Sequence, residues 1–165
     1  LEEAAASVPG DRQLGSSAFL EAGEIAYVVG DCARSLPLFE KAIALAPDYA
    51  PALNNAAFVT AKCGNAPDKA IAWATKAVEV APQVADLQDT LGYVLMKAGR
   101  VQDALAPLQR AVTMSPSPSP SLHLAEALAA AGRADEARET LGRLANLKLN
   151  EEQVADRDRI TNSLQ

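Results

Sequence analysis

Apolar positions recur every three or four residues along most of the chain, which is the spacing of amphipathic helices rather than strands. The apolar runs fall into four similar pairs. The first run of each pair ends at a glycine that is followed by a polar residue, which is typical of a helix C-terminus or a tight turn. These glycines recur at nearly equal intervals, at Gly30, Gly64, Gly99 and Gly132.

Prolines mark the ends of the second runs at nearly the same interval. They are Pro47, Pro82 and Pro116, each after an Ala or Ser. Since the residue before a proline is driven out of helical geometry, each proline predicts a helix end. Both markers give a period of about 34 residues, within the range of helical repeats. The repeating unit is therefore a helix–turn–helix.

We expect four such units, at 16–49, 50–84, 85–117 and 118–149. An N-terminal extension or partial helix precedes them at 1–15, and a capping helix follows at 150–165.

Composition supports an all-α fold, because 49% of residues are hydrophobic but only 4% are aromatic, and alanine supplies much of the apolar content. Small residues share one place in each first run (Gly23, Ala57, Gly92, Ala125) and one in the later second runs (Ala70, Ala104, Ala137). Small side chains allow two helices to pack closely. Pro37 and Pro107 lie inside predicted second helices, where we expect kinks or later helix starts.

The units resemble tetratricopeptide repeats, whose pattern is W-x₂-L-G-x₂-Y…A-x₃-F…P. The third unit carries the resemblance best, with Leu91-Gly92, Leu95, Ala104, Leu108 and Pro116 at matching places. No unit has the first-position Trp. The resemblance implies a right-handed α-solenoid of about four repeats whose first helices line a concave groove. The matching groove positions are Leu20, Glu24, Tyr27, Asn54, Asn55, Phe58, Lys62, Asp89, Tyr93, Met96, Lys97, His123 and Glu126.

Charge limits the choice of partner. The net charge of −6 disfavours nucleic acids and anionic membranes, and no apolar run is long enough to cross a bilayer. Some members of the family bind the C-terminal carboxylate of a partner with a clamp of five residues. Of the five matching places in this chain, only Asn55 carries the residue that the clamp uses. We therefore expect the groove to bind an extended or helical protein segment with apolar and basic residues. A homo-oligomer is the other partner considered.

Few residues suggest a catalytic or metal-binding role. His123 lies one helical turn from Glu126, but a single histidine makes neither a metal site nor a catalytic site, and no nucleophile or phosphate-loop motif is present. We expect no enzyme activity, cofactor or metal. Cys32 and Cys63 are predicted at the same edge of stacked repeats, either as two free thiols or as a disulfide, which would indicate an oxidising compartment.

These features predict a non-catalytic interaction scaffold. The alternatives are a structural spacer or self-assembling unit, and the recruitment domain of a larger enzyme or exopolysaccharide-system protein. The phrases "TLGYVLMKAG" and "SLHLAEALAAAGRADEARETLGRL" are similar to repeat proteins of bacterial exopolysaccharide and exosortase-linked systems. The chain opens with "LEEAAASVPGD", which lacks a signal peptide and an initiating Met, so we expect a soluble protein or excised domain of the bacterial cytoplasm or periplasm.

Overall fold

The structure is a computed structural model that describes residues 9–64 and 66–165. It consists of two compact units, Leu1–Pro82 and Gln83–Gln165, which are treated separately below. The part of the predicted N-terminal extension at residues 1–8 lies outside the described residues. Within the described residues all regular structure is helical and no strand occurs, so the predicted all-α class is confirmed.

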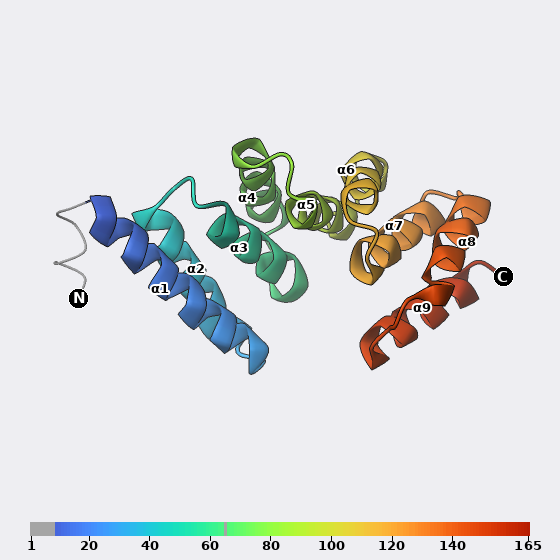
Figure 1. Cartoon of the computed structure of the whole chain (residues 1–165), viewed down its shortest axis with the longest axis horizontal. Helices are drawn as coiled ribbons and strands as arrows, with labels where there is room; N and C mark the ends of the chain where they lie inside the picture. The colour runs from blue at the N-terminus through green and yellow to red at the C-terminus, as the bar shows by residue number, and fades with distance from the viewer. Residues whose placement is uncertain (1–8, 65) are drawn as a thin grey trace. The chain divides into compact units, whose positions relative to one another are not determined.

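The first unit contains two helix pairs (Figure 1). They are α1 (Pro9–Val28), α2 (Cys32–Leu45), α3 (Ala50–Cys63) and α4 (Pro67–Val80). Each pair packs as an antiparallel hairpin, α2 also packs against α3, and the first helices α1 and α3 touch each other. The unit's core collects Leu20, Phe39 and Val59 together with small alanines.

The second unit contains two further pairs and a closing helix. They are α5 (Ala85–Lys97), α6 (Val101–Met114), α7 (Pro118–Ala130), α8 (Ala134–Gly142), the short 3₁₀ helix η2 (Arg143–Asn146) and α9 (Glu151–Ser163). Helix α7 packs against α5, α6, α8 and α9, so first helices are again neighbours. Helix α9 begins with a capping box, in which Asn150 and Gln153 exchange side-chain and backbone hydrogen bonds of 2.9 and 3.1 Å.

Three of the four predicted glycine turns adopt a left-handed backbone. Gly30, Gly99 and Gly132 have φ of 84°, 78° and 76°. After each of them the next residue donates its N–H back into the last helical turn, as Asp31 does to the Ala26 carbonyl at 2.9 Å. Gly64 is different, because its φ of −113° lies in the extended region. Its turn therefore follows the repeat period without sharing the left-handed geometry of the other three.

Close contact between paired helices explains the small residues. A Cβ built on Gly23 would lie 2.5 Å from the Phe39 ring, and one on Gly92 would overlap the Leu108 side chain. Phe39 and Leu108 are almost completely buried at these crossings. A bulkier residue at either glycine would therefore push the two helices of the pair apart.

Two helix starts differ from the sequence analysis. Of the kinks or later starts expected at Pro37 and Pro107, the later starts are wrong, because α2 begins at Cys32, α6 begins at Val101, and both helices continue through their prolines. Tertiary packing of the apolar faces outweighs the one backbone hydrogen bond that each proline removes. Helix α1 begins at Pro9, so residues 9–15 of the expected extension belong to the first helix.

The glycine crossing predicts a contrast between two Gly→Ala variants. Gly92→Ala forces Leu108 to move and should lower the free energy of unfolding by about 1–3 kcal/mol. Gly142→Ala meets no atom within 4 Å at a helical backbone position and should raise it by about 0.5–1 kcal/mol. Urea denaturation followed by circular dichroism measures both. Equal effects of the two substitutions would contradict the close crossing.

Candidate functional site

The exposed side of α1 and α3 in the first unit carries six of the predicted groove residues. We call this the α1/α3 face: Glu24, Tyr27, Asn54, Asn55, Phe58 and Lys62. Asn55 donates to the Glu24 carboxylate at 2.9 Å, which links the two helices. The Tyr27 and Phe58 rings meet edge to face with centroids 5.9 Å apart, and Lys62 Nζ lies 5.8 and 5.7 Å from them. An aromatic pair capped by an exposed cation is therefore the centre of this face.

The second unit repeats this arrangement on α5 and α7. We call this the α5/α7 face: Asp89, Tyr93, Lys97, His123 and Glu126. The Asp89 carboxylate lies 2.8 Å from His123 Nδ1, and both side chains are largely buried. The His123 ring lies 4.8 Å from the Tyr93 ring, and Lys97 Nζ lies 5.3 Å from Tyr93. Phe58–Lys62 and Tyr93–Lys97 are thus the same aromatic–lysine pair one repeat apart in the sequence.

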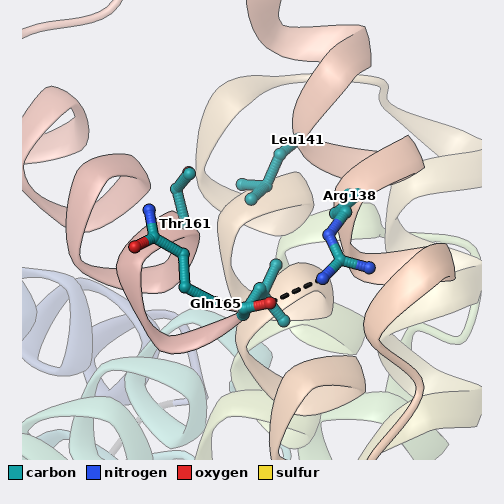
Figure 2. Close-up of a pocket in the computed structure, with 5 residues that line it drawn as sticks. Arg138, Leu141, Thr161 and Gln165 are labelled. Carbon is teal, nitrogen blue, oxygen red and sulfur yellow. Dashed lines mark hydrogen bonds between the residues drawn. The ribbon is translucent and has the colours of Figure 1, made fainter.

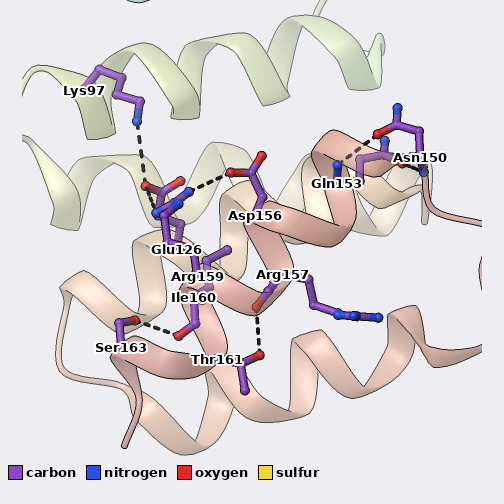
Figure 3. A network of polar contacts seen from close by, with 10 residues as sticks. All are labelled: Lys97, Glu126, Asn150, Gln153, Asp156, Arg157, Arg159, Ile160, Thr161 and Ser163. Atoms are coloured by element: carbon purple, nitrogen blue, oxygen red, sulfur yellow. Dashed lines mark hydrogen bonds and ion pairs between the residues drawn. The ribbon is translucent and has the colours of Figure 1, made fainter.

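Helix α9 extends the α5/α7 face with charge (Figure 3). Glu126 lies 3.7 Å from Lys97 Nζ and 3.2 Å from Arg159 Nη1, and Arg159 also contacts Asp156 at 3.0 Å. The hydrogen bonds that Arg159 donates to Asp156 and then to Glu126 hold the pKa of Arg159 above its usual value. Sequence reasoning missed Arg159 because α9 was treated only as a cap. Its place in the sequence, nearly one repeat after Glu126, was the available signal.

Burial separates the predicted groove residues into two groups. Leu20, Tyr93 and Met96 are each less than 10% exposed, and Leu20 belongs to the core of the first unit. Tyr27, Asn54, Asn55, Phe58, Asp89, His123 and Glu126 are half-buried, and Glu24, Lys62 and Lys97 are exposed. Only this second group reaches the surface, and within it the Asp89 and His123 side chains are the most covered. Leu20 and Met96 therefore belong to the interior and not to the faces.

Polar side chains lie at or next to one register position in three successive first helices. Asn54 and Asp89 share that position, and His123, one place further along in α7, pairs with Asp89 within the second unit. The Asn54 carbonyl oxygen is buried without a hydrogen-bond partner among the described residues. In the second unit, by contrast, the Asp89 carboxylate at this position is satisfied by His123 of the neighbouring first helix.

The two cysteines meet at one edge of the first unit. Cys32 at the start of α2 and Cys63 at the end of α3 are joined as a disulfide, with Cα atoms 6.2 Å apart. The bond spans 31 residues of sequence and ties the two repeats of this unit together.

A separate pocket of about 420 Å³ lies between α8 and α9, lined by Arg138, Leu141, Thr161, Leu164 and Gln165 (Figure 2). Arg138 donates to the Leu164 carbonyl at 2.5 Å and to Asp135 at 2.8 Å. The guanidinium is therefore already engaged by groups of the chain itself.

The described residues contain no group of three or more His, Cys, Asp or Glu side chains placed to bind a metal ion. Over those same residues, none of the helices combines the length and the apolar content needed to traverse a membrane. The candidate site consists of the α1/α3 and α5/α7 faces, with their rings and paired charges.

Helix pairs that recur at a regular period, with small residues at each crossing, define a helical-repeat protein. Two sequence models of the tetratricopeptide repeat match the chain, at residues 95–156 and 64–118, and together they span 64–156, more than half of it. The chain belongs to the tetratricopeptide-repeat family. No curated protein matches the sequence at a significant level.

Solved structures share the fold at low sequence identity. TTC0263, a thermophilic tetratricopeptide-repeat protein of Thermus thermophilus, has a TM-score of 0.80 and 21% identity, over 90% of this chain and 82% of that one. A Thermobaculum terrenum O-GlcNAc transferase mutant has a TM-score of 0.73 and 23% identity, over 81% of this chain but 26% of the enzyme. YrrB, titled a tetratricopeptide-repeat protein with an unusual peptide-binding site, has a TM-score of 0.64 and 21% identity, over 88% and 82%.

The cysteine pair predicts a redox-dependent stability. A bond across 31 residues should raise the free energy of unfolding by about 3–4 kcal/mol through loss of unfolded-chain entropy. We expect no reactive thiol in the native protein, and a lower urea midpoint after reduction with dithiothreitol. The Cys32→Ser/Cys63→Ser variant is the control, because its midpoint should not respond to reductant. Two thiols that react under native conditions would show that the bond is absent.

Proposed function

We propose that the chain is a non-catalytic scaffold that binds a segment of another protein on its α1/α3 and α5/α7 faces. Its tetratricopeptide-repeat fold is that of protein-interaction scaffolds in general. The peptide-binding site named for YrrB, which shares the fold, supports the same class of role. The observation that carries the proposal is the repeated aromatic–lysine pair beside an acidic residue, once in each unit.

The apolar part of the partner would contact the rings. Tyr27 and Phe58 are half-buried, so each keeps a rigid apolar edge that a partner side chain can cover at little entropic cost. Lys62 and Lys97 lie over the rings on flexible stems and can move aside. Partner side chains of intermediate size, such as Leu or Met, would cover these rings.

The basic part of the partner would contact Glu24 and Glu126. Glu24 is exposed and bound only by an amide among the contacts described above. Glu126 holds Lys97 and Arg159 at 3.7 and 3.2 Å in partly exposed pairs. Since exposed ion pairs contribute only about 0–1 kcal/mol each, a partner Lys or Arg can replace one of them at small cost.

A second candidate is the recruitment domain of a larger enzyme. It is favoured by the likeness to the O-GlcNAc transferase, of which this fold matches only 26% of the length. The sequence that flanks the chain in its gene distinguishes this candidate from a free scaffold. The expected link to exopolysaccharide systems, the compartment and the absence of catalysis stay predictions.

The acidic residues provide the test. Peptides selected on the wild-type protein from a displayed random library should be rich in apolar and basic residues. Glu24→Gln/Glu126→Gln keeps the size and hydrogen bonding of both side chains and should weaken these peptides by about tenfold or more, measured by calorimetry. The control is Glu40→Gln/Glu139→Gln, which removes one exposed, paired acid from the second helices of each unit.

The control variant should bind the selected peptides as the wild type does. Equal affinity for all three proteins, or a selection dominated by acidic peptides, would refute the proposed faces. Circular dichroism of each variant establishes that the helices are intact.

A further inference from the structure

Helix α9 is held in a fixed position on the second unit. Its first turn is set by the capping box, and Gln153 also donates to the Ser119 hydroxyl of α7 at 3.3 Å. Ile160 is 2% exposed and lies in a core that α7, α8 and η2 supply. Just past the helix, the Leu164 carbonyl accepts a hydrogen bond from Arg138 of α8. Contacts along the length of α9 therefore determine which of its side chains reach α7.

Arg159 is the side chain that α9 places on the α5/α7 face (Figure 3). It directly precedes the buried Ile160, which fixes the side of the helix from which it extends. Its guanidinium donates from Nη1 to Glu126 at 3.2 Å and from Nη2 to Asp156 at 3.0 Å. The Arg159 side chain is 55% exposed. Arg159 therefore contributes charge to this face and little packing to the core.

The acidic residues of the two faces are neutralised to different degrees. Glu24 of the α1/α3 face is exposed and accepts a hydrogen bond from the neutral Asn55 amide. Glu126 of the α5/α7 face lies 3.7 Å from Lys97 and 3.2 Å from Arg159, and its side chain is only 24% exposed. The Glu126 carboxylate is thus covered and balanced by two cations, whereas the Glu24 carboxylate is open to solvent beside a neutral group.

Arg159 has the chemistry of the partner residue that this face is proposed to bind. At Glu126 the guanidinium occupies acceptor positions that a Lys or Arg of a partner would otherwise use. Its positive charge also repels a second cation at short range. Because the Arg159–Glu126 pair is partly exposed, its strength is modest, and a partner cation can displace it at a measurable cost in affinity.

We propose that Arg159 is a specificity-determining residue of the α5/α7 face, where it competes from within the chain for Glu126 and lowers the affinity for basic partner segments. This role rests on the proposed function and adds the residue that sets the charge preference of one face. It also makes the two faces unequal, since a basic partner residue meets an open carboxylate at Glu24 and an occupied one at Glu126. The α5/α7 face should therefore favour basic residues less than the α1/α3 face does.

Arg159→Gln tests the proposal by removing the charge and keeping a polar side chain. The probe is a basic peptide that was selected on the wild-type protein and is weakened by Glu126→Gln alone. Arg159→Gln should bind this peptide about three- to tenfold more tightly in calorimetry, because Glu126 loses its competitor and the peptide a repelling charge. The gain should shrink as salt is added, since exposed charges are screened. Arg159→Lys keeps the charge and should return the affinity close to that of wild type.

Two controls separate competition at Glu126 from a structural role of α9. Arg157 lies two residues away, about 200° around the helix, where it pairs with Asp158 and points away from Glu126 in Figure 3. Arg157→Gln should therefore bind the peptide as wild type does. In a Glu126→Gln background, Arg159→Gln should no longer raise the affinity, because the acid for which Arg159 competes is gone. Circular dichroism and thermal unfolding establish that each variant is folded.

The outcomes distinguish this role of Arg159 from the proposed function. Unchanged or weaker binding by folded Arg159→Gln overturns the role, and so does a gain that persists in the Glu126→Gln background. Either result leaves the proposed function intact, because Glu126→Gln alone still weakens the peptide. If Glu126→Gln weakens none of the selected basic peptides, the α5/α7 face does not bind basic residues, and both proposals fail for this face.

Discussion

The close approach of the two helices in each repeat is the constraint on which the rest of the structure depends. At Gly23 and Gly92 the Phe39 and Leu108 side chains pack directly against the helix backbone, and no side chain fits between them. Because these crossings set the spacing within a pair, they also set where the next pair of the same unit can pack. The first helices then become neighbours, and residues a full repeat apart, such as Asp89 and His123, come within hydrogen-bond distance.

That arrangement gives the α1/α3 and α5/α7 faces their electrostatic character. A net charge of −6 suggests an acidic surface, but the carboxylates of the two faces are paired: Glu24 with Asn55, Asp89 with His123, and Glu126 with Lys97 and Arg159. Pairing across neighbouring helices orders the side chains before a partner arrives, which lowers the entropy cost of binding. The faces therefore offer preorganised rings and exchangeable ion pairs rather than bare negative charge.

The sequence predicts the period and class of this fold because its markers act locally. A glycine with positive φ or a proline after a helix ends that helix whatever packs against it, as Gly30, Gly99 and Gly132 show. The burial of a side chain could not be predicted in the same way. Counting along a helix gives the direction of a side chain but not what covers it. Tyr93 and Met96 point as expected and are nevertheless buried. Arg159 was missed because its role depends on the packing of α9 on α7.

Helices α1 and α9 differ in the side that faces away from their neighbours. In a repeat array an apolar side is covered by the next helix, whereas the outer side of a cap is polar. At the C-terminus, α9 buries Ile160 on its inner side and presents charge outward. In α1, Leu14, Ile25 and Val29 remain as apolar as their buried counterparts in α3. Leu14, Ile25 and Val29 therefore keep the apolar pattern of an internal contact, whereas α9 has the polar outer side of a cap.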